Sequence, residues 1–210
     1  MAVKSTHSAA DYLPQKMTWP SLCKAAGGCR GCDLYKNATR TVFGLGSRTA
    51  RLMLVGEQPG DEEDKQGLPF VGPSGKLLDR GLAEAGIPKK EVYVTNAVKH
   101  FKFEPRGKKR LHKTPSPREV AACRPWLLAE IEMIKPAVIM CLGATAAKSL
   151  LGNTFALTKN RGKWQLGPAS AKVMATYHPS AALRAPDHDA RAAMYAAIVE
   201  DLKTARRFLS

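Results

Sequence analysis

The chain has 210 residues and carries 33 Lys and Arg against 18 Asp and Glu, which gives a formal net charge of +15. A charge of this size favours a polyanionic partner, most often a nucleic acid, although a generally basic surface would produce the same count. Residues 1–20 lack the apolar core of a secretion signal, and no apolar run is long enough to span a bilayer. We therefore expect a cytoplasmic protein with no membrane partner and one domain over residues 1–210, in which residues 1–20 form an N-terminal arm or a short helix.

The chain contains 5 cysteines. Structural disulfides are rare in the cytosol, so these cysteines suggest a metal site first. Cys29 and Cys32 are separated by two residues, a spacing that lets two thiolates bind one metal ion or cluster, and Gly31 eases the turn between them. Two free thiols in a glycine-rich loop are the alternative. Cys23 is a less certain participant, and Cys141 lies inside an apolar run, where core packing is expected.

Buried strands alternate with helices along the chain. Apolar runs predict strands at residues 51–55, 92–98, 137–142 and 172–177. Helices are predicted at residues 76–85, 117–135, 143–152 and 187–208, and Ser116 with Glu119 has the pattern of a capping box before the second of these. We expect a polar loop at residues 61–66 and a hairpin or loops at residues 153–171. The order predicts an α/β fold, a three-layer α/β/α sandwich around a mainly parallel four-stranded sheet.

Polar side chains follow three of the predicted strands. Glu57 and Gln58 come directly after the first strand, Asn96 lies in the second, and His178 follows the fourth. Because the carboxyl ends of parallel strands share one edge of a sheet, and ligands bind at that edge, we expect these side chains to converge on one cleft. The alternative is that the three strand ends are unrelated.

The segment from Asn96 to Cys123 is rich in Lys and Arg and contains two histidines, His100 and His112. We predict a basic loop that leads into the helix beginning at Pro117. A loop of this composition suits contact with nucleic-acid phosphates. From the residues alone, such a phosphate contact is the simplest role for His112.

Four separated motifs resemble those of the iron–sulfur uracil-DNA glycosylases of family 4, namely Gly56–Gly60, Pro69–Gly75, Thr95–Lys99 and His178–Ser180. The resemblance covers residues 29–205. The basic loop differs, since family 4 has a cysteine where this chain has His100, and a shorter loop after it. The inserted Lys-Lys-Arg-Leu-His that ends at His112 resembles the Lys-Arg-Arg-Ile-His of UdgX, a branch in which the loop histidine attacks the DNA and stays bonded to it.

The resemblance implies how a flipped uracil would be held. Phe70 would stack on the base, Asn96 would pair with its edge and reject cytosine, and His178 would donate a hydrogen bond to O2 as negative charge develops there. Gln58 and the backbone of Gly56–Gly60 would contact the base or a flanking phosphate. From the residues alone, Phe70 could equally pack in the core, Asn96 could form a turn, and His178 could be structural.

The resemblance also implies that His112 is the nucleophile that bonds to the sugar C1′. An attacking imidazole must be neutral, and we expect the neighbouring cations Lys109, Arg110 and Lys113 to lower its pKa from about 6.5. Glu57 would orient water in a hydrolytic enzyme or stabilise the imidazolium of His112. The residues expected to contact DNA are Lys108, Lys109, Arg110, Lys113 and Ser180.

The implied cofactor is a structural 4Fe–4S cluster bound by Cys29, Cys32, His100 and Cys123, with Cys23 as the competitor for the place of His100. The ligand types alone also suit zinc. The implied partner is uracil-containing DNA, single-stranded as well as double-stranded, and we expect a monomer that reaches the nucleoid through DNA. Two other interpretations remain open: a hydrolytic glycosylase with multiple turnovers, and an iron–sulfur DNA-binding protein without catalysis.

Overall fold

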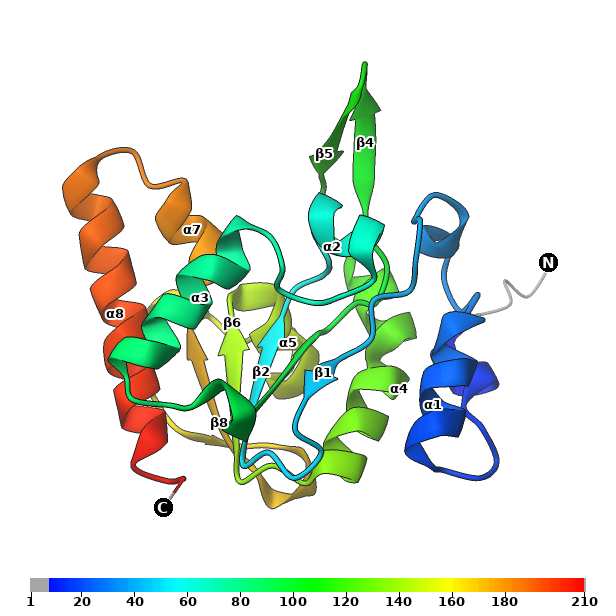
Figure 1. Cartoon of the computed structure of the whole chain (residues 1–210), viewed down its shortest axis with the longest axis horizontal. Helices are drawn as coiled ribbons and strands as arrows, with labels where there is room; N and C mark the ends of the chain where they lie inside the picture. Colours follow the sequence, from blue (N-terminus) through cyan, green and yellow to red (C-terminus); the bar gives the residue numbers. More distant parts are fainter. Residues whose placement is uncertain (1–7, 210) are drawn as a thin grey trace.

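The computed structural model describes residues 8–209 and contains a six-stranded sheet in the order β1-β3-β2-β6-β8-β7 (Figure 1). The four central strands are parallel, and β1 and β7 add one antiparallel strand at each edge. The fold class predicted from the sequence is confirmed, but the sheet has six strands rather than four. Both edge strands are only two residues long, too short to leave a pattern in the sequence. The bounds are β1 Leu45–Gly46, β2 Leu52–Gly56, β3 Val92–Asn96, β6 Val138–Leu142, β7 Gln165–Leu166 and β8 Lys172–Thr176.

Helices cover both faces of the sheet (Figure 1). Successive strand residues point to opposite faces, so Leu52 and Leu54 of β2 pack with α3 and α8, whereas Met53 and Val55 pack with α4 and α5. The predicted capping box at Ser116 is present. Cys141 lies fully buried in the core beside α4 and α5, as expected. The bounds of the main helices are α3 Pro73–Glu84, α4 Pro117–Ile134, α5 Ala144–Leu151 and α8 His188–Arg206.

The N-terminal segment packs against the outside of α4. Residues 1–7 of the predicted arm lie outside the described residues. From Ser8 onward the chain is ordered by contacts: Ala9 is buried in the same apolar cluster as Leu22, Cys29 and Trp126. This cluster brings the cysteine-bearing segment next to the helix that carries Cys123. The elements are η1 Ala9–Tyr12, α1 Trp19–Gly27 and η2 Asp33–Lys36.

Two segments predicted as loops are regular structure. Residues 61–66 form α2, whose first turn is acidic and therefore complements the positive N-terminal end of the helix dipole. The basic loop forms an antiparallel hairpin, β4 Phe103–Arg106 and β5 Lys109–His112, which turns at Gly107 with φ of 58° and projects from the body of the molecule (Figure 1). Alternating apolar and polar residues would have indicated strands, but this segment is dominated by charged residues and does not show that alternation.

The remaining elements are short. They are η3 Lys89–Glu91, α6 Leu157–Asn160, η4 Pro168–Ser170 and α7 Pro179–Leu183. In the segment 153–171, β7 pairs antiparallel with β8, and α6 precedes it. Across residues 8–209, no helix combines the length and the apolar character that crossing a membrane requires.

Candidate active site

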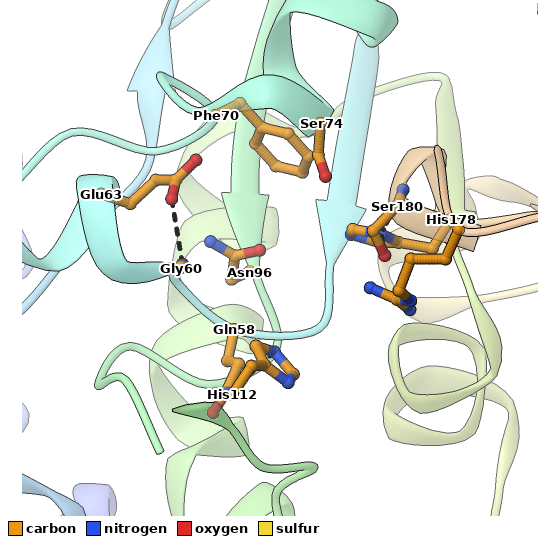
Figure 2. A pocket seen from close by; sticks show the side chains of 10 residues that line it. Gln58, Gly60, Glu63, Phe70, Ser74, Asn96, His112, His178 and Ser180 are labelled. Atoms are coloured by element: carbon orange, nitrogen blue, oxygen red, sulfur yellow. Dashed lines mark hydrogen bonds between the residues drawn. The ribbon is translucent and has the colours of Figure 1, made fainter. Parts of the chain in front are cut away.

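The carboxyl ends of β2, β3 and β8 meet at a cavity of about 170 Å³ (Figure 2). The structure therefore brings together Gln58, Phe70, Asn96 and His178, and it adds His112 from the hairpin. Gly60, at the end of the backbone segment expected to contact the base or a phosphate, also lines this cavity, together with Glu63, Ser74 and Arg184, which sequence reasoning did not identify. A second cavity of about 620 Å³ adjoins it, and the two share Gln58, His112, His178, Ser180 and Arg184. Glu57 lines the second cavity.

Asn96 and Phe70 form one side of the smaller cavity (Figure 2). Asn96 is 3% exposed, yet its side-chain amide has no hydrogen-bond partner among residues 8–209. A buried amide is costly unless it is paired, so this amide is available for a ligand. Phe70 has φ of 56°, an unusual conformation for a bulky residue, and its ring lies beside Gly56. A Cβ at Gly56 would collide with both the Asn96 amide and the Phe70 ring.

Buried charges hold the two loops and the strand that carry these groups. The Glu63 carboxylate accepts hydrogen bonds from Gly60 N at 3.1 Å and Gly72 N at 2.9 Å, and so ties the loop after β2 to the loop that presents Phe70. Beneath Asn96, Lys99 Nζ donates to the backbone carbonyl of Asn96 at 2.7 Å and pairs with Glu130 at 2.5 Å. Both partners of this ion pair are almost fully buried, so the end of β3 is firmly positioned.

His178 is held in one tautomer by the turn that follows it. The backbone N–H of Ser180 donates to His178 Nδ1 at 3.1 Å, and the Ser180 hydroxyl lies 2.7 Å from the same nitrogen. Because Nδ1 accepts, the neutral ring carries its proton on Nε2. Burial, with the charges of Arg184 and His112, lowers the pKa of His178 to about 4. Near neutral pH His178 is therefore an uncharged donor through Nε2.

His112 lies at the wall between the two cavities. Its Nε2 is 3.6 Å from Glu57 Oε1 and 3.0 Å from Gln58 Nε2, and Figure 2 shows Gln58 and His112 together. Burial lowers the pKa of His112, Glu57 raises it, and Arg184 lowers it. The predicted direction is confirmed, but the predicted cause is wrong. The largest cause is burial, and the cation that contributes is Arg184 at the end of α7, not Lys109, Arg110 or Lys113.

Gln58 fastens the base of the hairpin to the end of β2. Its Oε1 accepts from Lys102 N at 3.0 Å, and its Nε2 donates to Lys102 O at 3.1 Å and Lys113 O at 3.0 Å. These bonds fix the orientation of the amide and use both hydrogens of its Nε2, so Gln58 has no further N–H group to donate to His112 Nε2. We conclude that the amide of Gln58, expected to contact the base or a phosphate, is occupied by the hairpin.

Arg110 fastens the hairpin to α2. Its guanidinium pairs with Asp61 at 2.5 Å and with Asp64 at 2.6 Å, and the Asp64 side chain is fully buried. This role differs from the predicted contact with DNA phosphates. Lys113 pairs with Glu104 at 2.6 Å on the exposed face of the hairpin. Of the remaining predicted DNA contacts, Lys108 and Lys109 are exposed, and Ser180 lines both cavities.

Three of the predicted cluster ligands lie together behind the hairpin. Cys29, Cys32 and Cys123 share one apolar cluster. Burial raises the pKa of Cys32 and of Cys123; the charge of Cys29 contributes to raising the pKa of Cys32, and the charges of Cys32 and Cys29 contribute to raising that of Cys123. Backbone N–H groups point at two of the sulfurs, Gly31 N at 3.4 Å from Cys29 Sγ and Lys99 N at 3.3 Å from Cys123 Sγ. Hydrogen bonds of this kind support thiolate ligands of a cluster, so the donor set fits the implied group.

His100 and Cys23 occupy different places relative to these thiols. His100 lines a cavity of about 260 Å³ together with Cys29, and its Nε2 lies 2.8 Å from Thr41 Oγ1. Burial lowers the pKa of His100 to about 4, so its ring is neutral. Cys23 lies instead near Glu130, and its pKa is raised by burial and then by the charge of Glu130. Among residues 8–209, no group of three or more His, Cys, Asp or Glu side chains is arranged to hold a metal ion.

These features define a class of protein before any comparison is made. The smaller cavity has the size and walls for one planar heterocycle, with an aromatic ring on one side and an unpaired amide at the edge, in a strongly cationic chain. They are the features of an α/β protein that takes a single base out of a nucleic acid.

The chain belongs to the uracil DNA glycosylase superfamily, whose family model matches residues 43–203. A type-4 uracil-DNA glycosylase of Thermotoga maritima is 41% identical over 182 residues, which cover 86% of this chain and 89% of that protein. A type-4 uracil-DNA glycosylase of Archaeoglobus fulgidus is 40% identical over 166 residues, covering 75% of this chain and 79% of that one. The predicted resemblance to family 4 is thereby confirmed at the level of the family.

Proposed function

We propose that this chain excises uracil from DNA and that His112 then bonds to C1′ of the abasic sugar, so that each molecule acts once. The observation that carries the proposal is the position of His112 Nε2, 3.6 Å from Glu57 Oε1 and 3.0 Å from Gln58 Nε2, at the wall shared by the two cavities. A histidine that only contacted phosphate would not need a carboxylate at 3.6 Å on its inner side.

In this proposal the smaller cavity holds the flipped uracil. Phe70 stacks on the base, and the free amide of Asn96 accepts from N3–H and donates to O4. Cytosine presents the opposite pattern of donor and acceptor at these two positions, so it would leave buried polar groups unpaired. The absence of any partner for the Asn96 amide among the described residues supports this role.

Cleavage breaks the bond between C1′ and N1, and the electron pair leaves with the base. Negative charge then grows on uracil O2, where the neutral His178 donates through Nε2, while positive charge grows on the sugar. The Glu57 carboxylate faces the same cavity as His112 and stabilises that cation. The uracil anion takes a proton from solvent as it departs.

Capture of the sugar uses the lone pair of His112 Nε2, which forms a C–N bond to C1′. The ring becomes an imidazolium that keeps its proton on Nδ1, and Glu57 stabilises this charge until the proton is lost to solvent. The lowered pKa of His112 keeps the ring neutral, and therefore nucleophilic, near pH 7. No good leaving group remains in the product, so the bond is stable.

We further propose that Cys29, Cys32, Cys123 and His100 bind a 4Fe–4S cluster with a structural role. The three thiols lie together, His100 shares a cavity with Cys29, and Cys23 faces Glu130 instead, which favours His100 as the fourth ligand. When bound, the cluster would tie the N-terminal segment to the base of the hairpin and to α4. The proposed partner is uracil-containing DNA in both single-stranded and double-stranded form.

A hydrolytic glycosylase is the second candidate. The relatives are named type-4 uracil-DNA glycosylases, and these names fit a hydrolase equally well. In that case Glu57 would orient a water molecule toward C1′, and His112 would not react.

A denaturing gel with uracil-containing oligonucleotides separates the two candidates. The wild-type protein should give one shifted, denaturation-resistant band and release one uracil per molecule on either form of DNA. His112→Ala should give no shifted band, whereas His188→Ala, a control at an exposed histidine on α8, should give the wild-type band. Several uracils released per molecule, or a shifted band that survives His112→Ala, would refute the crosslinking proposal.

A further inference from the structure

Thr145 contacts the carboxylate that faces the proposed nucleophile. Its hydroxyl donates a short hydrogen bond to Glu57 Oε2, while the other oxygen, Oε1, is the atom 3.6 Å from His112 Nε2. The two oxygens of Glu57 are thus divided between two partners, one on α5 and one on the hairpin. Thr145 has no counterpart among the motifs found in the sequence.

The backbone places Thr145 firmly. β6 ends at Leu142, and Gly143, with φ of 91°, turns the chain into α5, while its N–H donates to Thr176 O at 2.9 Å. The next residues of α5, Ala146 and Ala147, are fully buried against the sheet. The hydroxyl of Thr145 is therefore held by the central sheet and not by the projecting hairpin.

A competing partner for Glu57 lies in the same cavity. Arg184 lines this cavity with Glu57, and its guanidinium forms no ion pair with any residue among 8–209. The terminal torsion of a glutamate side chain is broad, so a carboxylate without a fixed partner turns toward the nearest cation. A Glu57 that turned to Arg184 would leave His112 and would also neutralise the guanidinium.

We propose that Thr145 is a positioning residue that holds Glu57 with Oε1 toward His112 and the reacting sugar, and so keeps it from pairing with Arg184. The inference rests on the proposed function, because it concerns the same carboxylate. It assigns to the first turn of α5 a role in orienting the acid of the site, which Thr145 exerts through its hydrogen bond to Glu57.

The test uses three variants of the full chain. Thr145→Val keeps the shape and removes the hydroxyl, Thr145→Ser keeps the hydroxyl, and Ser149→Ala removes a buried hydroxyl of the same helix that bonds only within the helix. Rates of uracil release and of adduct formation are measured in single turnover, with protein in excess, on one uracil-containing oligonucleotide. Binding of the same oligonucleotide without uracil is measured alongside.

We expect Thr145→Val to lower both rates about 10-fold, the usual scale for one hydrogen bond to a charged group, with unchanged binding of uracil-free DNA. Thr145→Ser and Ser149→Ala should keep wild-type rates. Rescue by serine distinguishes orientation of Glu57 from a loss of stability, which would affect binding and both rates together. Wild-type rates in Thr145→Val, or an equal loss in Thr145→Ser, would overturn the inference.

The wild-type protein alone tests the proposed function, and the Thr145 variants test the role of Thr145. Release of uracil without an adduct would refute the crosslinking step, and the release rate of Thr145→Val would still decide the role of Thr145. If the wild type releases no uracil at all, the glycosylase function and this inference fail together.

Discussion

The two histidines of the candidate site come from regions of very different construction. His178 follows the buried strand β8, and the turn that begins α7 holds its ring within two residues of sequence. His112 ends a hairpin strand, its side chain is 48% exposed, and residues from β2 and α2 hold the hairpin in place. The position of His178 is set by backbone pairing, whereas that of His112 depends on side-chain contacts.

This difference separates the two halves of the proposed reaction. Departure of the base depends on groups positioned by the sheet. Capture of the sugar depends on the hairpin β4–β5, which side-chain contacts attach to the rest of the protein. Substitutions far from the cavity can therefore weaken capture alone, but any change that weakens departure weakens both. Substitutions in the sheet and in the hairpin should therefore affect the two steps differently.

His178→Ala should lower the rate of uracil release at least about 100-fold, since it removes the donor to the developing negative charge. Adduct formation should fall by the same factor, because no cation forms for His112 to attack. His112→Ala, in contrast, should abolish the adduct and leave the release of the first uracil measurable. The measurement is single-turnover release of free base beside a denaturing gel. Equal loss of base release in both variants would contradict the division between the two histidines.

Arg110→Ala should lower the rate of adduct formation about 10-fold and the rate of first uracil release by less than about 3-fold. Without Arg110 the hairpin loses its ion pairs to Asp61 and Asp64, and a small displacement of a nucleophile is costly. Arg106→Ala is the matched control, since it removes an exposed arginine of the same hairpin. If both variants behave alike, the effect comes from loss of charge and not from loss of the attachment to α2.

In Arg184→Gln, the rate of adduct formation should begin to fall at a higher pH as the solution is made acidic; this fall is the acid limb of the pH profile. The pKa of His112 lies below 6.5, so the neutral, reactive ring is present above that pKa and is lost as the pH falls through it. Removal of the Arg184 charge raises the pKa of His112, so protonation begins at a higher pH. Measuring the rate of adduct formation between about pH 4 and 8 gives the pH at which this fall occurs. An unchanged limb would show that Arg184 does not act on His112.

Thr176→Val should leave both rates unchanged and change the free energy of unfolding by no more than about 1 kcal/mol, in the stabilising direction. The hydroxyl of Thr176 is buried at the end of β8 and has no hydrogen-bond partner within residues 8–209, so its removal relieves an unsatisfied group just before His178. Thermal unfolding and single-turnover release check this prediction. A loss of activity would mean that the strand is a less rigid support for His178 than the structure indicates.

The sheet and the first cavity could be predicted because their signals are local and strong. Continuous apolar runs identify the four buried strands, and the parallel arrangement then forces their polar ends together. Gln58, Asn96 and His178 accordingly line one cavity, as expected. The capping pair Ser116 and Glu119 could be predicted for the same reason, since it depends on residues only three positions apart.

The supports of the site could not be predicted, since they depend on pairs distant in sequence. The acidic run from Asp61 to Asp64 has no apolar period, and it forms a helix that is tied in by Arg110 and by backbone N–H groups of Thr39 and Arg40. Thr145 lies in an ordinary helical pattern and Arg184 directly follows the short helix α7, and only the fold brings them beside Glu57 and His112. For Gln58, the position was predicted correctly but the partner was not.

The hairpin β4–β5 pairs with no strand of the six-stranded sheet. The length of the hairpin can therefore change without shifting the register of any core strand, and a few side-chain contacts are enough to orient it. An insertion or deletion at the turn of this hairpin therefore leaves the carboxyl ends of β2, β3 and β8, and the cavity that they form, in place.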